Sequence, residues 1–315
     1  MWNGTALSSG GSNEASSSVS QSEEGTNLSF GTNALANNST GENNLAVGYE
    51  SLYNNVSGSI NEAMGYRALY QNTSGSGNNA VGAYALNANT TGSFNNAQGA
   101  FALYKNTTGA NNTGVGAEAL RRNLTGSNNT AIGQSALSFN TANNNTGIGA
   151  QALFSNTSGT GNNAVGAYAL RDNTTGKFNN AQGTYALFKN TTGSNNTGVG
   201  AEALRRNLTG NDNTAIGQSA LASSTSSFNT AIGAGSSYTS TTGQKNSSLG
   251  YRTLYRNVSG SNNTALGFSA GFNSTGSGNV FIGSNAGRAN TGSNNVMIGF
   301  EAVSYTHLTL PTTTI

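Results

Sequence analysis

The sequence contains no cysteine, one histidine and one proline among 315 residues. The absence of cysteine excludes disulfide bridges, thiolate metal sites and cysteine catalysis. A Ser-His-Asp mechanism needs a positioned histidine, and the only candidate, His307, lies in a C-terminal tail. Charged residues make up only 8% and the formal net charge is +2, so nothing in the charge favours nucleic acid or an anionic membrane as a partner.

Long apolar runs are also missing, because hydrophobic residues amount to 34% and are scattered. No stretch approaches the roughly 20 apolar residues of a membrane-spanning helix. Residues 1–28 form a low-complexity segment that lacks the basic start and apolar run of a signal peptide. We therefore expect any membrane attachment to require an anchor that this sequence does not contain.

Glycine is abundant, with 44 residues, and Asn, Thr and Ser dominate the remainder. Such a composition is common in disordered chains, but a strict repeat argues against disorder. The phrase GSNNTAIGQSAL at 126–137 returns as GSNNTGVGAEAL at 193–204, and residues 77–137 recur almost unchanged as 161–221. One glycine anchors seventeen units at intervals of 16 or 17 residues: Gly31, Gly48, Gly65, Gly82, Gly99, Gly116, Gly133, Gly149, Gly166, Gly183, Gly200, Gly217, Gly233, Gly250, Gly267, Gly283 and Gly299.

Each unit combines two apolar positions with turn residues. The residue before the anchor glycine is mostly Val or Ile, and the fourth residue after it is leucine in thirteen units. Asn-Thr-Gly and Asn-Asn sequences between the units are typical of turns. We predict strand, turn, short strand and turn in every unit, which is too short for a βαβ unit. The sequence therefore predicts an all-β fold, a parallel β-solenoid of about 17 coils over residues 29–303, with coils about 4.8 Å apart and a length of roughly 80 Å.

The two faces of the strand suggest an interface between chains. If the Val and Ile row faces the coil interior, the residue two before the anchor faces outward, because neighbouring strand residues alternate. That row is almost entirely Ala and Gly, which favours close approach of another backbone; the alternative is relief of crowding near turns. Gln98 and Gln182 replace the aliphatic residue, and buried amides need partners. We assign Ala131, Ala164, Ala215, Gln98 and Gln182 to this interface.

The position after the leucine is predicted to face solvent, and it is rich in aromatic and arginine side chains. This composition is typical of a surface that recognises glycans or proteins. The alternative is that the rings stack between coils and only stabilise the sheet. The candidate binding residues are Tyr104, Arg121, Arg171, Phe188, Arg205 and Tyr255.

Candidate catalytic and metal sites are weak. Asp172 and Asp212 lie in turns, and no two acids occupy equivalent positions in adjacent units. The glycine-rich turns lack the following helix that would cradle a phosphate. Calcium-binding repeats would place aspartate in every turn. We therefore expect no enzyme activity, no cofactor and no metal.

The repeated NNTAIGQSAL phrase resembles the head repeat of YadA-like trimeric autotransporter adhesins over residues 31–303. This resemblance implies a left-handed β-roll, a homotrimer, and a rod on the bacterial cell surface that attaches to host glycans or matrix proteins. The repeats are also similar to the NTTGxNNTAVG repeats of bacteriophage tail fibres, and Asn279-Val280-Phe281-Ile282-Gly283 is more like the fibre variety. That alternative places the chain in a virion. An ice-binding solenoid is a weaker alternative, because its flat Thr-x-Thr face is missing.

Residues 304–315, SYTHLTLPTTTI, follow no repeat. They resemble translated adapter or vector sequence at the end of a truncated reading frame, so we expect a fragment with an artefactual tail. The alternative is a short strand that caps the rod.

Overall fold

The computed structural model describes residues 20–21 and 27–303, and these form eighteen short strands. None of the described residues belongs to a helix long and apolar enough to cross a membrane. The strands are β1 (Ser20–Gln21), β2 (Leu28–Phe30), β3 (Leu45–Val47), β4 (Glu62–Met64), β5 (Asn79–Val81), β6 (Asn96–Gln98), β7 (Thr113–Val115), β8 (Thr130–Ile132), β9 (Thr146–Ile148), β10 (Asn163–Val165), β11 (Asn180–Gln182), β12 (Thr197–Val199), β13 (Thr214–Ile216), β14 (Thr230–Ile232), β15 (Ser247–Leu249), β16 (Thr264–Leu266), β17 (Val280–Ile282) and β18 (Val296–Ile298).

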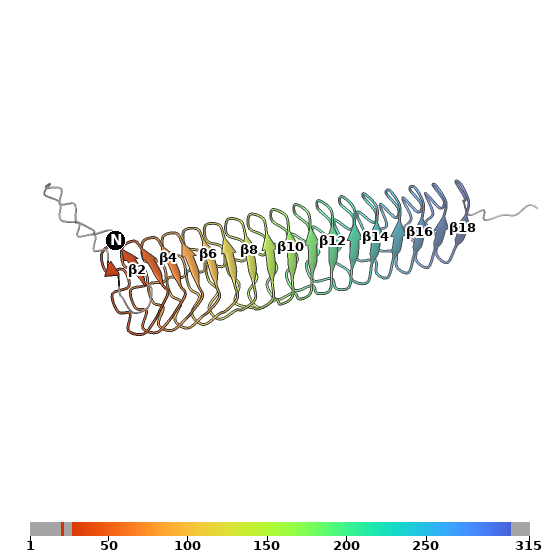
Figure 1. The fold of residues 1–315 in the computed structure, drawn as a ribbon. Helices are drawn as coiled ribbons and strands as arrows, with labels where there is room; N and C mark the ends of the chain where they lie inside the picture. Colours follow the sequence, from red (N-terminus) through yellow and green to blue (C-terminus); the bar gives the residue numbers. More distant parts are fainter. Residues whose placement is uncertain (1–19, 22–26, 304–315) are drawn as a thin grey trace, which may run out of the picture.

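The strands β2 to β18 stack along a straight rod, one strand in each coil (Figure 1). Each pairs in parallel with the next strand in sequence, so that Thr113 lies beside Thr130 and Val115 beside Ile132, while β1 is antiparallel to β2. The predicted parallel β-solenoid is therefore confirmed. Sixteen steps at the usual strand spacing of about 4.8 Å give a rod of about 77 Å. The low-complexity segment, apart from 20–21 and 27–28, and the tail at 304–315 lie outside the described residues.

The segment around the leucine is a series of turns, and the predicted second strand is wrong. The residues two and four positions after the anchor glycine have positive φ, as in Arg67 (52°) and Leu69 (50°). A left-handed conformation costs a non-glycine residue about 1–2 kcal/mol, and it prevents a continuous strand. The backbone still bonds to the next coil, because the N–H of Leu69 donates to the carbonyl of Ala85 over 3.0 Å.

The interior of each coil is lined by the small residues, so the predicted orientation of the strand was reversed. Ala131 is 0% exposed, whereas Ile132 is 40% exposed. Of the thirteen leucines at this position, all but Leu35 are fully buried, as predicted, and Leu35 in the first unit is partly buried. The coil is narrow: a Cβ added to Gly114 would lie 3.5 Å from Cγ of Leu103 in the preceding coil. Only a small residue, namely alanine, glycine or serine, fits opposite the leucine, and the aliphatic residue beside it must face outward.

In the last coils the bulky side chain stands at the position of the small residues, and the leucine position is occupied by glycine. Phe281 stands in the row of small residues and is fully buried, while glycine replaces leucine at Gly271 and Gly287. A Cβ added to Gly271 would come within 2.7 Å of Cδ2 of Phe281. The phenyl ring therefore fills the space that leucine side chains occupy elsewhere.

Two rows of buried asparagines run along the interior, and we call them the first and second asparagine ladders. They were predicted as turn residues only. The first ladder lies seven residues after the anchor glycine, and the second ladder four residues before it. The first consists of Asn38, Asn55, Asn72, Asn89, Asn106, Asn123, Asn140, Asn156, Asn173, Asn190, Asn207, Asn257 and Asn290. The second consists of Asn27, Asn44, Asn61, Asn78, Asn95, Asn112, Asn129, Asn145, Asn162, Asn179, Asn196, Asn213, Asn229, Asn246, Asn263, Asn279 and Asn295.

Most ladder amides bond to the preceding coil and to the carbonyl of a turn residue, which is usually glycine. Asn72 donates from Nδ2 to Oδ1 of Asn55 over 2.7 Å and to the Gly75 carbonyl over 2.9 Å. In the second ladder, both the backbone N–H and Nδ2 of Asn61 donate to Oδ1 of Asn44, over 3.0 and 3.1 Å. Asn61 Nδ2 also reaches the same Gly75 carbonyl over 2.9 Å. Because buried polar groups are costly without partners, the ladders fix the register between neighbouring coils.

The first ladder is broken where serine replaces asparagine, at Ser224, Ser240 and Ser274. Serine is too short to reach the amide of the preceding coil. Among the described residues, the buried atoms without a hydrogen-bond partner include Oδ1 of Asn207 and Asn257, which precede two of these breaks. The breaks therefore leave acceptors unsatisfied in the second half of the rod.

The anchor glycines are required by close stacking. Gly133 has φ of 129°, and a Cβ added to it would lie 2.6 Å from the carbonyl carbon of Gly149. No other residue fits this conformation and this distance. The repeated glycine therefore marks the corner at which each coil lies directly on the next.

We predict that Ala131→Leu destabilises the coil by about 1–3 kcal/mol, because extra methylene groups must enter a narrow, filled interior. Ile132→Thr is the control, since this neighbouring side chain faces outward. Denaturant unfolding of single chains, at dilutions confirmed by sedimentation, measures both. Equal losses would contradict the orientation of the strand.

We predict that Ser224→Asn stabilises the rod by about 0.5–1.5 kcal/mol, because it supplies a donor to Oδ1 of Asn207. Asn140 occupies the same place in another 16-residue coil, so the larger side chain fits there. Thermal unfolding should show the gain, and Ser223→Asn is the control outside the ladder. No difference between the two variants would contradict the role of the ladder.

Candidate functional site

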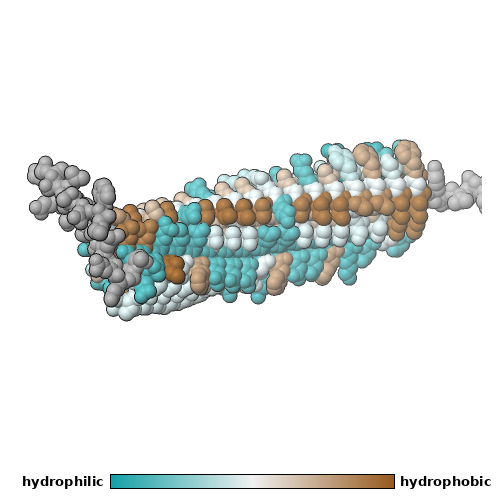
Figure 2. Space-filling model, in the orientation of Figure 1, coloured by the Kyte–Doolittle hydropathy of each residue, from teal (hydrophilic) through white to brown (hydrophobic). Residues whose placement is uncertain are grey.

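One face of the rod carries an exposed apolar stripe, formed by the third residue of each strand. Several of these side chains are substantially exposed, from 36% for Ile148 to 66% for Ile298. Figure 2 shows the stripe as a brown band along the rod that hydrophilic side chains interrupt. Its members are Phe30, Val47, Met64, Val81, Val115, Ile132, Ile148, Val165, Val199, Ile216, Ile232, Leu249, Leu266, Ile282 and Ile298. An apolar surface of this length, broken only at Gln98 and Gln182, is unusual on a monomer and is typical of an interface.

The predicted interface residues divide between the stripe and the interior. Gln98 and Gln182 lie in the stripe and are exposed. Each donates from Nε2 to the side-chain Oδ1 of the asparagine that starts its own strand, over 3.2 and 3.3 Å. Ala131, Ala164 and Ala215 are 0% exposed inside their own coil, so the prediction that they contact another chain is wrong.

A second feature, the aromatic ladder, consists of residues two and five positions after the anchor glycine. The candidate binding residues belong to it and lie at the surface, half-buried, in accordance with their predicted outward position. The residues two positions after the glycine were not recognised from the sequence, although they follow the same period. The rings are Tyr53, Tyr70, Tyr84, Phe101, Tyr104, Phe154, Tyr168, Tyr185, Phe188, Tyr238, Tyr255 and Phe272, and the arginines are Arg67, Arg121, Arg171, Arg205, Arg252 and Arg288.

The rings of the ladder contact each other across coils. Tyr168 and Tyr185 stack with centroids 5.1 Å apart and an interplanar angle of 4°, and Phe188 meets Tyr185 edge-on at 5.3 Å. Such pairs contribute about 0.5–1.5 kcal/mol each beyond the burial of their area. The rings therefore do stack between coils, which was the alternative interpretation, and they also remain half-exposed at the surface.

Arginines cover the rings at two equivalent places in the duplicated segments. Arg121 lies 5.8 Å from the Phe101 ring, which touches Tyr104. In the second copy, Arg205 lies 5.7 Å from the Tyr185 ring, which touches Phe188. Each cluster pairs a predicted aromatic residue with a predicted arginine. The repeat therefore presents the same binding-type patch twice on one rod.

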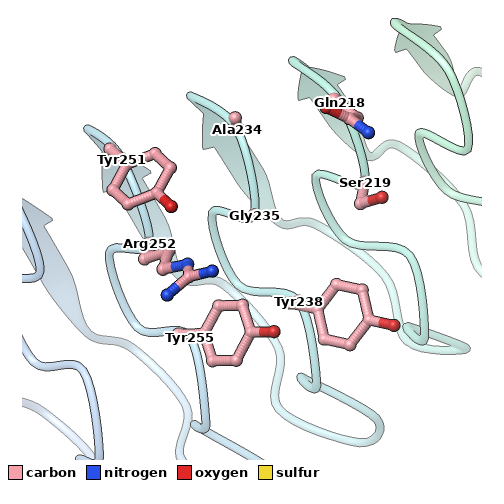
Figure 3. A pocket seen from close by; sticks show the side chains of 8 residues that line it. All are labelled: Gln218, Ser219, Ala234, Gly235, Tyr238, Tyr251, Arg252 and Tyr255. Atoms are coloured by element: carbon pink, nitrogen blue, oxygen red, sulfur yellow. The ribbon is translucent and has the colours of Figure 1, made fainter.

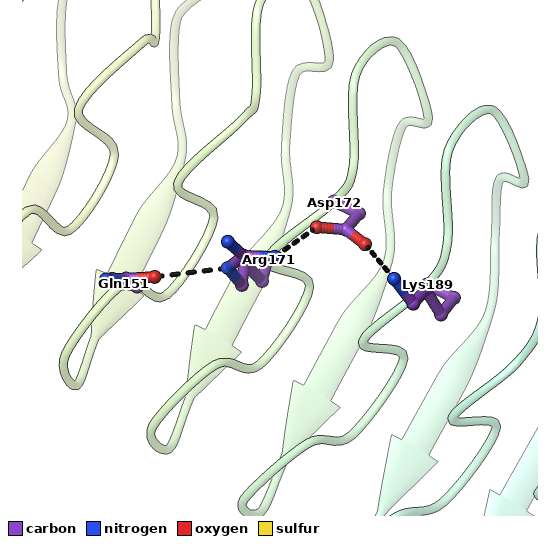
Figure 4. Close-up of polar contacts among 4 residues, drawn as sticks. All are labelled: Gln151, Arg171, Asp172 and Lys189. Atoms are coloured by element: carbon purple, nitrogen blue, oxygen red, sulfur yellow. Dashed lines mark hydrogen bonds and ion pairs between the residues drawn. The ribbon is translucent and has the colours of Figure 1, made fainter.

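Polar contacts link Arg171 to its neighbours over three coils (Figure 4). Nε of Arg171 donates to Oε1 of Gln151 over 3.1 Å, and Nη1 pairs with Oδ1 of Asp172 over 2.9 Å. Lys189 pairs with the other oxygen of Asp172 over 3.0 Å. Arg171 also lies 5.6 Å from the Phe188 ring. Partly exposed ion pairs contribute at most about 1 kcal/mol, so stability alone does not explain this cluster.

Charge also enters the ladder near the N-terminal end. Arg67 Nε pairs with Oε2 of Glu50 over 2.7 Å, and this hydrogen bond raises the pKa of Arg67. The hydrogen bond between Tyr49 and Glu50 raises the pKa of Tyr49. Partial burial raises the pKa of Tyr66, which stacks on Tyr49 at 5.4 Å. Tyr49 and Tyr66 lie one position after the anchor glycine, beside the aromatic ladder.

A hollow of about 240 Å³ opens in the aromatic ladder beside Tyr255 (Figure 3). Its floor is the backbone of Ala234 and Gly235, and Tyr238, Tyr251 and Arg252 stand around it with Tyr255. Gln218 and Ser219 of the preceding coil close the opposite side. Tyr255 is the one predicted binding residue that lines this hollow.

The described part of the chain gives little support for a catalytic or metal site. Residues 20–21 and 27–303 contain no group of three or more His, Asp or Glu side chains placed to hold a metal ion. Asp172 is engaged by Arg171 and Lys189. His307 lies outside the described residues.

Comparison of the chain with models of known protein families gives no match, and a search of curated proteins gives none at the significance required.

Proposed function

We propose that this chain is a structural and adhesive rod at a bacterial surface, which works as a bundle of three identical copies and has no enzyme activity. The apolar stripe supports this proposal most directly. The core of each coil is complete without the stripe, because alanine, leucine and the asparagine ladders already fill the interior. A row of Val and Ile that lies outside the core of its own coil and stays partly exposed favours a partner outside it.

An identical copy is the partner that fits the stripe best. The stripe presents one side chain for each coil, at intervals of about 4.8 Å along a straight line. A second rod lying parallel and in register offers the same spacing over the whole length. A globular partner would match only a short part of it.

Gln98 and Gln182 favour one alignment of the copies. In register, each glutamine faces its own equivalents across the bundle axis, and the amides can bond to one another. In other registers an amide would lie against aliphatic side chains, which costs about 1–3 kcal/mol for each unsatisfied group. A shift of five coils would match only one of the two positions, because Gln98 and Gln182 are five coils apart.

The number of copies, the left-handed winding and the surface location rest on the resemblance of NNTAIGQSAL to the heads of trimeric adhesins. In a trimer the three stripes meet around a common axis, which leaves the aromatic ladders available for contact. Repeated weak contacts along three parallel chains act together through avidity. We propose host glycans or matrix proteins as the partners of the aromatic ladder.

The shaft of a phage tail fibre is the second candidate. Its specific support is in the last coils, where Phe281 fills the space left by Gly271 and Gly287. These coils carry the Asn-Val-Phe-Ile-Gly phrase on which the fibre resemblance rests. A fibre uses the same bundle of copies and belongs to a virion.

We predict that Ile132→Lys together with Ile216→Lys dissociates the bundle, because both side chains are exposed in the stripe and the charges would be buried between copies. Sedimentation equilibrium should change from trimer to single chains, while circular dichroism stays that of the parent.

Thr108→Lys with Thr192→Lys is the control, since these exposed turn residues add the same charge at equivalent places outside the stripe. A parent chain that is monomeric, or a stripe variant that remains trimeric, would contradict the assembly.

We predict that replacing Tyr104, Arg121, Phe188 and Arg205 by serine reduces attachment to a glycan array or to matrix-coated surfaces several-fold or more, because contacts are lost at both patches in every chain. These side chains lie outside the core, so the trimer should persist with a modest loss of thermal stability.

The matched control replaces four exposed turn threonines, Thr91, Thr108, Thr175 and Thr192, by alanine. If the aromatic variant attaches as well as this control, the ladder serves stacking between coils and does not bind.

A further inference from the structure

We propose that the hollow over Gly235 binds a single acidic sugar, such as the terminal uronic or sialic acid of a glycan. The inference rests on the adhesive function proposed above and assigns one site and one ligand class to it. The observations that carry it are the shape of the hollow, the rings at its sides, and an arginine without a carboxylate partner.

One side chain is missing from the aromatic ladder where the hollow lies. At the position two after the anchor glycine, Gly235 is the only glycine among the seventeen units, and all the remaining units carry a side chain there. The backbone there is unchanged: φ is 65° at Gly235, 58° at Tyr185 and 55° at Gln151. The backbone conformation therefore does not demand glycine at this position. A Cβ added to Gly235 would lie 3.2 Å from Cε2 of Tyr255 and 3.4 Å from Cγ of Arg252, so these two side chains pack closely over the glycine and border the hollow.

The size of the hollow selects a small ligand. Its volume of about 240 Å³ lies below the roughly 300–1,000 Å³ of pockets that hold drug-sized molecules. A single sugar ring suits this space better than an oligosaccharide chain. The open surface allows the rest of a glycan to extend into solvent.

The sides of the hollow are flat rings with polar edges. Tyr238 and Tyr255 stack with centroids 5.1 Å apart and an interplanar angle of 9°. Tyr251 stands on the other side, as Figure 3 shows. A tyrosine combines an apolar face with a hydroxyl that needs a partner. This combination fits a ligand that has an apolar ring face and a rim of hydroxyl groups, and Gln218 and Ser219 add further polar groups.

Arg252 gives the site its charge preference. Its guanidinium lies 5.1 Å from the Tyr251 ring and 5.4 Å from the Tyr255 ring. Four of the six ladder arginines, Arg67, Arg121, Arg171 and Arg205, pair with carboxylates. Within the described ranges, no carboxylate lies within ion-pair distance of Arg252 or Arg288, and of these two only Arg252 lines the hollow. A planar guanidinium held over rings is well suited to a ligand carboxylate.

The coil beneath the hollow also departs from the repeat in its interior. Ser237 replaces the core leucine, and hydroxyl groups bond to each other where alanine and leucine pack elsewhere. Ser236 Oγ lies 2.7 Å from Ser248 Oγ and 3.1 Å from Thr253 Oγ1. This polar layer separates two apolar clusters, which end at Ala231 and begin again at Leu254. Local departures that cost packing are typical of functional sites.

The test measures binding of monosaccharides to the full chain by calorimetry and saturation-transfer NMR. The probes are glucuronate and N-acetylneuraminate, with glucose as the neutral control and acetate as the anion control. We expect saturable binding of at least one acidic sugar, and at least about tenfold weaker binding of glucose and acetate. No saturable binding of either acidic sugar, or acetate binding as tightly as the sugar, would overturn the proposal.

Two variants locate the site. Gly235→Tyr fills the hollow with the side chain that Tyr185 carries on the same backbone, and it should abolish binding. Arg252→Gln should weaken acidic sugars about tenfold or more and leave glucose unchanged. Thr108→Tyr adds the same side chain at an exposed turn in a distant coil, outside the aromatic ladder, and should bind like the parent. Binding by Gly235→Tyr equal to that of Thr108→Tyr would overturn the assignment.

The outcome separates this site from the adhesive function. If the monosaccharide binds and no surface retains the rod, the site stands and the adhesive function fails. If the rod attaches to surfaces and Gly235→Tyr changes no monosaccharide binding, the adhesive function stands and this site fails.

Discussion

The hydrogen bonds of the buried asparagine ladders are the constraint on which the rest of the rod depends. An amide such as Asn61 bonds to Asn44 in the coil before it and to the Gly75 carbonyl, so its position along the rod is fixed by two hydrogen bonds. A coil that shifted by one residue would leave several buried groups unsatisfied. The coils can therefore differ in length only where the ladders allow it. The distance from Asn123 to Asn129 is one residue longer than the distance from Asn140 to Asn145, and this turn absorbs the change between 17 and 16 residues.

The period of the sequence was sufficient to predict the parallel solenoid, the number of coils and the buried leucine. It was insufficient to orient the strand. The alternation of residues along a strand separates its two faces. The larger side chains indicate the inner face only when the interior of the coil is wide, and here alanine packs directly on leucine. The exchange of volume between Phe281 and the glycines at Gly271 and Gly287 was the signal for the correct orientation. Two compensating departures in one unit show that the positions face each other.

The candidate surfaces were predicted in part. The outward position of Tyr104, Arg121 and their equivalents followed from the buried leucine beside them, but the second row of rings needed the left-handed turns that place it next to the first. The asparagines were assigned to turns because asparagine is common there. Their constancy beside variable Thr and Ser neighbours indicates burial. Gly235 could be singled out in sequence as an exception, whereas the hollow above it required the coordinates of three coils.

The in-register stacking of coils has a consequence for how such a rod changes length over evolution. Residues 161–221 repeat 77–137 after a whole number of coils, so every ladder, glycine corner and stripe position continues across the junction. Each coil contacts only its neighbours, and an inserted block meets the same surfaces that it left. Unequal recombination within the gene can therefore lengthen or shorten the rod by whole coils without a new folding problem. Reach becomes a quantity that selection adjusts in steps of about 4.8 Å, independently of what the surface binds.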